Sequence, residues 1–400
     1  MRKNLWIALA AILLTGWTGG TAHAAPDATS GGVQAPSPLP TASAEAAKPA
    51  IRLDQVRFAD ADRGWTWGTS GDDPSTTVWR TADGGKTWRS APLGSGVRNA
   101  TLAMTGAGRG WAVGPSDCRM ASGSPVCAKL TILHTSDGGA SWTPQWTKED
   151  PKADADNELE AVNESTAYVR TRTSIRKTTD AGRNWIDVSI PSAEAFPYEI
   201  SFVDESTGYA AGRLGTECPG KGLVPSTPKA DCRTAVWKTR DGGQTWKRLA
   251  HAPRQNGEWY PADIQFVDRR NGFLLLVNPN THASILYVTS NGGVGWKPRN
   301  TKIPGIRPYP VKLDFLDPRV GYVPLSVGAG PVEGGLLRTV NGGTTFTKLK
   351  DPRLVSVEDA DFLTARRGFV VAMNPDRPES RLLLGTADGG ERWNDLTPKA

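Results

Sequence analysis

The feature that most constrains the fold is a short segment that the sequence repeats seven times. The first copy is Thr81-Ala-Asp-Gly-Gly-Lys-Thr-Trp88, and the later copies begin at Thr135, Thr178, Thr239, Thr289, Thr339 and Thr386. The acidic positions of the first and last copies, Asp83 and Asp388, are six repeats apart, which gives a mean period of about 51 residues. A repeat of this length fits one four-stranded antiparallel sheet, the blade of a β-propeller.

Each copy places Asp or Asn before a glycine pair or its equivalent, between two runs of strand-forming residues. Glycine adopts positive φ without steric cost, and a short Asp or Asn side chain accepts hydrogen bonds from turn amides, so the pattern predicts a β-hairpin. The closing aromatic, Trp88 in the first copy, starts the outgoing strand and can cover the turn. We therefore expect a structural role for the repeated positions, which are Asp83, Asp137, Asp180, Asp241, Asn291, Asn341 and Asp388.

These copies resemble the Asp-box, or bacterial neuraminidase repeat, of sialidases, sortilin-like receptors and a photosystem II assembly factor of plants and cyanobacteria. The departures from the usual pattern are Ala181 for the first Gly, Phe346 for Trp, and Asn184, Gly295 and Arg392 for Thr or Ser. The resemblance implies an all-β fold, a seven-bladed β-propeller of four-stranded antiparallel blades with an Asp-box in each C–D hairpin. It is a likeness of fold and is weak evidence of function.

A second repeat lies upstream of the boxes. Alternating apolar residues lead to a polar turn and then to a small residue followed by an aromatic one, as in 56–65 and 313–322. This pattern predicts strands A and B of each blade, and the runs that flank the box predict strands C and D. Residues 51–400 then form one propeller domain, which can exceed the usual domain size because a ring grows by adding blades.

The first 50 residues differ from the repeats. Arg2-Lys3, an apolar run from Leu5 to Leu14 and the sequence Ala22-His-Ala24 predict a secretion signal peptide over residues 1–24 and a secreted product. That run is too short to span a bilayer, and no later run is long enough, so we expect no membrane partner. Residues 25–50 are rich in Ala, Pro, Ser and Thr and predict a disordered leader or a propeptide.

Charge and cysteine content limit the partner classes further. Without Arg2 and Lys3 the formal net charge falls from +6 to +4, a mild excess that does not indicate nucleic-acid binding. Four cysteines in an exported chain predict two disulfides, and of the three possible connectivities the local one pairs Cys118 with Cys127 and Cys218 with Cys232. Neither pair has the spacing or the histidines of a zinc site, so no metal is expected there.

Strand direction divides the connections between two faces. The A–B turns share one face with the Asp-boxes. The B–C loops, expected at 68–77, 114–129 and 212–233, share the other face with the D–A connections. Because D–A connections lead into the innermost strands, their aromatic and Arg side chains should surround the channel mouth and either bind a partner or plug the channel. The candidate binding residues are Trp146, Tyr198, Arg254, Trp259, Tyr260, Arg307 and Tyr309.

The box face is the alternative docking face, because its A–B turns are rich in arginine and could receive an acidic partner. The arginines are Arg63, Arg109, Arg269, Arg270, Arg319, Arg366 and Arg367.

No residue set indicates a reaction, and we expect no catalytic residue, cofactor or metal. Only His134, His251 and His282 follow the signal segment, and the sequence has neither H-E-x-x-H, nor G-x-S-x-G, nor the early R-I-P motif of sialidases. The acidic run 150–160 resembles the start of an EF-hand but has Leu159 at the required Gly position. We expect a solvated linker there, and calcium binding is the alternative.

The favoured function is therefore a non-enzymatic, monomeric binding protein that contacts another protein. The export pattern, the leader and the number of boxes also resemble secreted actinomycete propellers that act on dispase-like and thermolysin-like neutral metalloproteases and promote their autolysis. This resemblance implies a secreted metalloprotease as partner. The alternatives are an assembly factor or chaperone-like scaffold for another exported protein, and a glycan-binding lectin or sialidase-like glycosidase.

Overall fold

A computed structural model of the chain describes most of the expected propeller domain. The described residues are 51–71, 73–106, 108–121, 124–153, 156–171, 174–191, 195–214, 233–253, 259–278, 280–281, 283–300, 303, 312–326 and 334–399. The chain divides into two compact units, residues 1–47 and 48–400, and the described residues all belong to the second. Among them, no helix has the length and apolarity needed to cross a membrane. The expected signal and leader lie outside the described residues and stay predictions.

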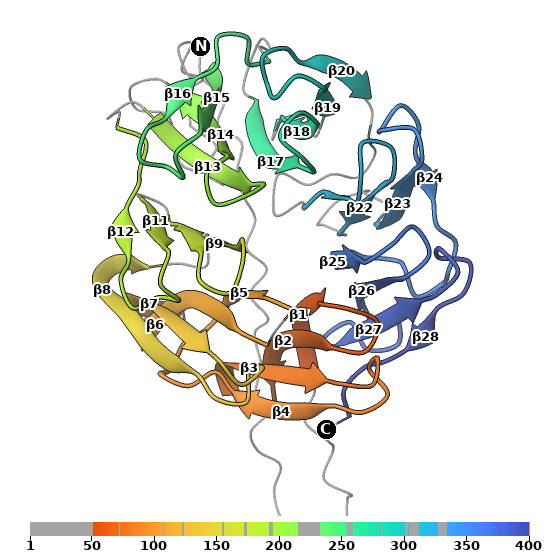
Figure 1. Ribbon diagram of the computed structural model, residues 1–400. Helices are drawn as coiled ribbons and strands as arrows, with labels where there is room; N and C mark the ends of the chain where they lie inside the picture. The colour runs from red at the N-terminus through yellow and green to blue at the C-terminus, as the bar shows by residue number, and fades with distance from the viewer. Residues whose placement is uncertain are drawn as a thin grey trace, which may run out of the picture. The chain divides into compact units, whose positions relative to one another are not determined.

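In the described part of the second unit, 28 strands form seven antiparallel sheets of four strands each, and Figure 1 shows these sheets following one another around a ring in sequence order. The predicted seven-bladed β-propeller is confirmed. Blades one to four consist of β1 (Ile51–Phe58), β2 (Gly64–Ser70), β3 (Asp73–Thr81), β4 (Arg89–Pro92), β5 (Thr101–Met104), β6 (Gly110–Ala121), β7 (Ser124–Thr135), β8 (Thr143–Ala153), β9 (Glu158–Ala161), β10 (Ala167–Arg170), β11 (Ile175–Thr178), β12 (Ile186–Asp187), β13 (Ala195–Phe202), β14 (Gly208–Leu214), β15 (Arg233–Thr239) and β16 (Lys247–Arg248). Blades five to seven consist of β17 (Tyr260–Phe266), β18 (Gly272–Val277), β19 (Ser284–Thr289), β20 (Lys297–Asn300), β21 (Asp314–Phe315), β22 (Gly321–Leu325), β23 (Gly335–Thr339), β24 (Thr347–Lys348), β25 (Val357–Phe362), β26 (Gly368–Met373), β27 (Arg381–Thr386) and β28 (Asn394–Asp395).

Buried apolar side chains join neighbouring blades. Tyr209 in the second strand of blade four stacks on Phe266 in the first strand of blade five, with ring centroids 3.4 Å apart. Tyr168 stacks on Phe202 in the same way between blades three and four. A stacked aromatic pair contributes about 0.5–1.5 kcal/mol beyond the area it buries. The Gly-aromatic pattern of the sequence therefore sets both the start of each second strand and its packing on the next blade.

The ring closes by side-chain packing, because blades seven and one each contain four consecutive strands and share none. Phe369 of β26 stacks on Phe58 of β1 at 3.4 Å. The indole of Trp88 in the first box donates to the carbonyl of Leu396, after the last strand, at 2.8 Å. The interface that closes the ring thus uses a stacked ring pair and an indole hydrogen bond, as the interface between blades three and four does.

The turn between the third and fourth strands holds the repeated motif in every blade. In blade one, the Thr81 hydroxyl accepts from the Gly85 amide at 2.9 Å and donates to Asp83, which also accepts from the amide and hydroxyl of Thr87. Hydrogen bonds from Thr87 are the main reason that the pKa of Asp83 falls to about 2. The bond from the Gly amide to the Thr hydroxyl recurs in all seven turns. Ala181 takes the glycine position of the third turn with a φ of 59°.

The expectation of B–C loops at 68–77 and 114–129 is wrong, because strand pairing continues into both segments. In blade two, β6 and β7 remain paired almost to their connection, so 114–129 is a β-hairpin. Asp117, with a φ of 55°, interrupts the pairing without changing the register, and pairing resumes at Cys118 opposite Cys127. In blade one, β2 and β3 likewise pair as far as Ser70 and Asp73. Most of the third expected loop, 215–232, lies outside the described residues.

The turn geometry leads to a stability prediction at Thr239, which is 1% exposed and accepts from the Gly243 amide at 2.8 Å. Thr239→Val should lower the free energy of unfolding by about 1–3 kcal/mol, because it leaves a buried amide unpaired. Urea unfolding followed by tryptophan fluorescence measures this change. Thr245→Val is the matched control, because Thr245 bonds the same Asp241 from an exposed position. Equal losses for both variants would contradict the assigned role of the buried hydroxyl.

Candidate functional site

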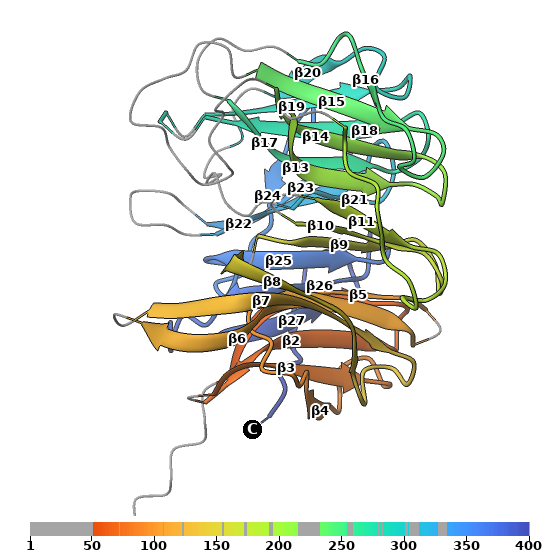
Figure 2. The same cartoon turned by 90° about the vertical axis from the view of Figure 1, so that its left-hand side faces the viewer.

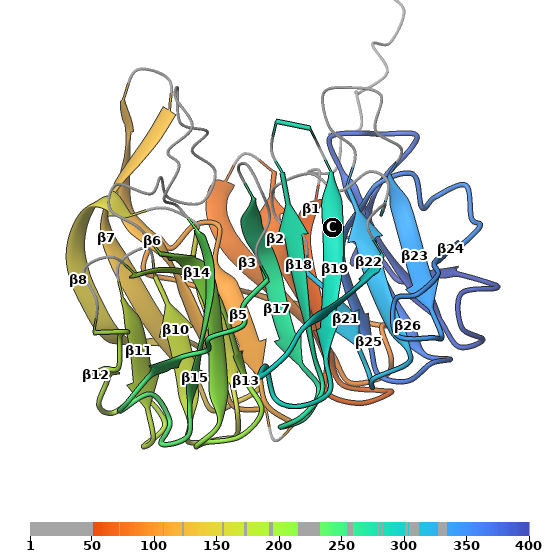
Figure 3. The same ribbon diagram turned by 90° about the horizontal axis from the view of Figure 1, so that it is seen from above.

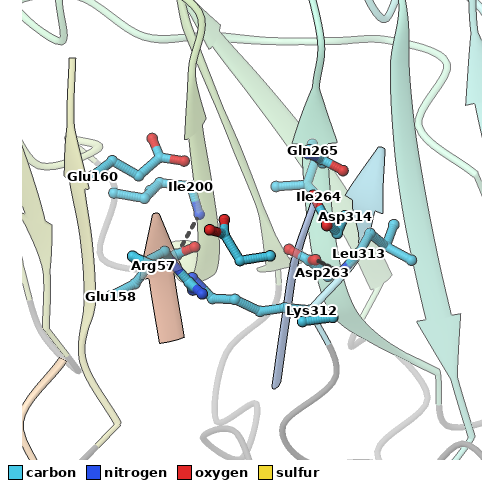
Figure 4. A pocket seen from close by; sticks show the side chains of 12 residues that line it. Arg57, Glu158, Glu160, Ile200, Asp263, Ile264, Gln265, Lys312, Leu313 and Asp314 are labelled. Atoms are coloured by element: carbon cyan, nitrogen blue, oxygen red, sulfur yellow. Dashed lines mark hydrogen bonds between the residues drawn. The ribbon is translucent and has the colours of Figure 1, made fainter. Parts of the chain in front are cut away.

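Residues in or beside the first strands of six blades line a polar cavity of 180 Å³ in the centre of the ring. Figure 4 shows side chains from several blades that converge on it, with Glu158 and Glu160 on one side and Asp263 and Asp314 on the other. Asp361 completes a set of five carboxyl groups in the lining, against two cationic groups. The cavity is therefore acidic.

The carboxyl groups that line the cavity already accept hydrogen bonds from backbone amides of the next blade. A first strand has no strand on its inner side, so alternate backbone N–H groups need another acceptor. The preceding blade supplies it: Glu158 accepts from the Ile200 amide at 2.8 Å, and Glu160 from the Phe202 amide at 2.7 Å. The same bonding joins other blades through the pairs Ser201–Phe266, Asp263–Leu313, Gln265–Phe315, Asp314–Phe362, Asp359–Val56 and Asp361–Phe58.

Burial in the channel raises the pKa of several of these carboxyl groups. Desolvation, reinforced by repulsion from Glu158, raises the pKa of Glu160 well above its ordinary value. Desolvation with repulsion from Asp361 does the same to the pKa of Asp314. The pKa of Asp361 itself rises to about 6, with desolvation as the main cause and Arg57 opposing it. The cavity is therefore less negative near neutral pH than its composition indicates.

Three buried carboxyl groups in the channel lie close enough to hold a metal ion. Glu158, Glu199 and Asp263 each offer one oxygen, and these oxygens lie within 4.8 Å of one another. Glu158 also faces the Arg170 guanidinium, with the Arg170 Nε atom 3.9 Å from its carboxylate oxygen. Because Glu158 and Asp263 also accept backbone amides, the cluster is accounted for by blade pairing and internal charge balance.

The other distinctive element is the β6–β7 hairpin of blade two, which extends past the neighbouring strands in Figures 2 and 3. A disulfide joins Cys118 to Cys127 across it, which confirms this predicted pair. Lys129 forms ion pairs with Asp117 at 3.1 Å and with Glu149 on β8 at 3.6 Å. The outer strand β8 runs alongside β7 as far as Ala153. The hairpin is thus braced by a covalent bond and by a third strand.

The apolar side chains near the end of this hairpin face solvent. Met120 is 65% exposed and Val126 is 44% exposed. A braced element with exposed apolar side chains is typical of a protein contact surface.

The candidate binding residues that the structure describes do not form one surface. Trp146 lies in the outermost strand β8, with Arg176 4.5 Å above its ring, so the expectation that it surrounds the channel mouth is wrong. Tyr260 is 3% exposed in β17 and lies under the Arg213 guanidinium at 4.3 Å. Trp259 is partly buried against the apolar core of blades four and five.

The side chain of Tyr198 and residues Arg254, Arg307 and Tyr309 lie outside the description, as do Cys218 and Cys232. A binding role for the whole set stays a prediction.

Sequence reasoning missed the channel carboxyl groups. Glu158 and Glu160 belong to the first strand of blade three, so the expectation of a solvated linker over 150–160 is wrong there. The pattern that could have revealed them is an acidic or amide residue at alternate positions of an expected first strand, as in Asp359-x-Asp361. Alternate residues of a strand share a face, and in an innermost strand that face lines the channel.

Comparisons with known proteins match the fold. No model of a known protein family matches the sequence, and no curated protein matches it. Among solved structures, YCF48 bound to a D1 peptide is similar at 20% identity and a TM-score of 0.53, over 85% of this chain and 94% of that one. An ulvan lyase of polysaccharide lyase family PL25 reaches 0.55 at 11% identity, over 88% and 96%. The propeller domain of the Trilobed protease from Pyrococcus furiosus reaches 0.54 at 9% identity, over 87% and 98%. These likenesses show the β-propeller fold alone.

The channel leads to a pH prediction at Asp361. Its pKa of about 6 lies above the ordinary 3.8, so its contribution to stability is fully present below pH 3.8 and is lost as the pH rises through 6. Asp361→Asn keeps an acceptor for the Phe58 amide and removes the charge. Relative to wild type, the variant should gain about 1–3 kcal/mol in free energy of unfolding between pH 4 and pH 7, as measured by urea unfolding.

Asp83→Asn is the control with the opposite sign. Because the pKa of Asp83 is lowered to about 2, its contribution to stability is present above pH 3.8 and is lost as the pH falls through 2.

Stability curves of wild type and Asp361→Asn that run parallel from pH 4 to pH 7 would contradict the assignment at Asp361.

Proposed function

We propose that this chain is an exported, non-enzymatic propeller that binds another protein through the face carrying the B–C hairpins and the D–A connections. The observation that carries the proposal is the disulfide-braced β6–β7 hairpin with Met120 and Val126 exposed near its end. Apolar side chains on a rigid, projecting element lose little conformational entropy when a partner covers them.

Export is part of the proposal and has two supports. The N-terminal pattern around Arg2-Lys3 and Ala22-His-Ala24 is that of a signal peptide. The Cys118–Cys127 disulfide suits an oxidising compartment, because thiols are kept reduced in the cytosol of most organisms.

For the partner we propose a secreted neutral metalloprotease of the dispase or thermolysin class. The support is the resemblance to secreted actinomycete propellers that promote the autolysis of such proteases. The propeller would act by binding: holding a protease surface loop in a conformation that a second protease molecule cleaves requires no chemistry from the propeller. The peptide-bound state of YCF48 is an example of peptide binding by this fold.

An assembly scaffold for an exported protein remains the alternative, supported by the likeness to YCF48 alone. A lectin that stacks sugars on Trp259 and Tyr260 is disfavoured, because Tyr260 is buried beneath Arg213 and Trp259 packs into a core.

The test adds the purified protein to a thermolysin-like protease and follows intact protease by gel densitometry. We expect wild type to accelerate autolysis severalfold. Met120→Asp with Val126→Asp should weaken the effect by about tenfold or more, because both charges would need to be desolvated in the contact. Ile186→Asp is the matched control, since Ile186 is 54% exposed on blade three. An autolysis rate that wild type leaves unchanged refutes the protease partner, and loss of the effect in both variants refutes the hairpin as the contact.

A further inference from the structure

A cavity of 360 Å³ opens between blades five and six on the box face, opposite the face of the β6–β7 hairpin. We name it the blade five–six notch. Its lining includes Phe273, Val288, Gly295, Trp296, Pro318 and Gly342. This volume is within the usual range of small-ligand pockets.

At three other blade interfaces, those that follow blades three, four and six, the corresponding position is filled by a tyrosine. Tyr168 donates to the carbonyl of Glu205 at 3.0 Å, and Tyr209 donates to the carbonyl of Arg269 at 3.1 Å. Tyr322 donates to the carbonyl of Ala365 at 3.1 Å. Each of these carbonyls belongs to the A–B turn of the next blade, so the tyrosine hydroxyl fixes that turn.

A long cationic side chain accompanies each tyrosine across the strand pair. Tyr168 pairs with Lys177, Tyr209 with Lys238, and Tyr322 with Arg338. Lys177 donates to the carbonyl of Glu205 at 3.3 Å, and Lys238 to the carbonyl of Gly292 at 3.4 Å. The phenol and the cation together fill the space between neighbouring blades.

Blade five lacks both polar groups. The tyrosine position holds Phe273, and its partner across the strands is Val288. The box position that carries Thr87 in blade one carries Gly295 here. The A–B turn carbonyl at this interface belongs to Pro318, and within the described part of the chain no group donates a hydrogen bond to it. Phe273, Val288 and Gly295 are each smaller or less polar than the residues at the same positions of the blades compared above. Together they leave the space of the cavity.

Blade seven provides an internal comparison, because its pair Phe369 and Gly385 also lacks polar atoms. There Arg367 donates to the carbonyl of Ala61 at 3.3 Å. The side chain of Leu396 lies 2.5 Å from where a Cβ atom on Gly385 would be, so that space is filled. The loss of a tyrosine therefore does not open a cavity by itself.

The surroundings of the notch favour a negatively charged partner. Lys297 and Arg299 line it, and none of its described lining residues is Asp or Glu. The two boxes beside it have the amides Asn291 and Asn341, where the other five boxes have Asp. The same two boxes carry the exposed residues Val294 at 60% and Val340 at 51%. Positive charge around a cavity whose wall is partly polar and partly aromatic is complementary to an acidic chain with one tyrosine side chain.

We propose that the blade five–six notch is a docking pocket for a tyrosine side chain within an acidic segment of a partner protein. The phenol ring packs against Phe273, Val288 and Trp296, and its hydroxyl donates to the carbonyl of Pro318, as Tyr209 does for Arg269 within the chain. Carboxylates on either side of the tyrosine pair with Lys297 and Arg299. This site is separate from the β6–β7 hairpin and does not depend on the function proposed for it.

The test uses a fluorescein-labelled peptide of sequence Glu-Asp-Tyr-Asp-Glu and a second peptide with Phe in place of Tyr. Fluorescence anisotropy at low ionic strength should show binding of the first peptide to the full-length protein. The second should bind about tenfold more weakly, because it lacks the hydroxyl donor. Raising the salt concentration should weaken both, because exposed charges are screened.

Two variants rebuild the closed interface and should abolish binding. Phe273→Tyr with Val288→Lys restores the pair found in blades three and four. Gly295→Thr restores the usual box residue, and the new Cβ atom would meet only the Asn291 amide at an ordinary 3.5 Å. Both follow the repeat pattern, so thermal unfolding should be unchanged. Phe369→Tyr is the matched control and should bind like wild type, as should the Met120→Asp, Val126→Asp protein.

Several outcomes would overturn the proposal. These are no binding to wild type, equal binding of the Tyr and Phe peptides, and binding that survives in both closed variants. Sedimentation showing a dimer that the closed variants lose would assign the notch to a second copy of the chain. Binding of a uronate oligosaccharide without the peptide would assign it to an acidic sugar.

Discussion

The structure depends on how each blade covers the open edge of the next. An innermost strand has N–H groups that no neighbouring strand accepts, and seven such strands face one channel. Acceptor side chains of the preceding blade pair with these groups, as Glu158 does with the Ile200 amide and Asp361 with the Phe58 amide. The ring therefore needs no shared strand to close, and the channel must carry buried acceptor side chains, which in this chain are mostly carboxyl groups.

This requirement accounts for the chemistry of the channel. Carboxyl groups that would suggest a metal site or a catalytic pair elsewhere are spaced here by strand geometry, with Glu158 and Glu160 two residues apart on one face. Burial raises their pKa values, because the neutral form costs less to desolvate. Distinctive sites are then better sought where a blade departs from the repeat, as at the β6–β7 hairpin and at Phe273.

The sequence by itself determined the number of blades and their phase. The motif from Thr81 to Trp88 acts within one hairpin, and every hydrogen bond that the Thr81 and Asp83 side chains make stays within the turn. Local chemistry of this kind can be predicted from consecutive residues, as can the Gly-aromatic start of each second strand. The pairing of Cys118 with Cys127 was predictable for the same reason, since nine positions separate them.

Only the tertiary structure decided which side chains meet across blades. Asp361 and Phe58 are 303 positions apart, and no local pattern relates them. The notch beside Phe273 depends on a turn of the following blade at Pro318, and the burial of Tyr260 depends on Arg213 from the preceding one. The physical reason is that strand periodicity fixes which face a residue is on, whereas the neighbour that covers this face is set by the closed ring.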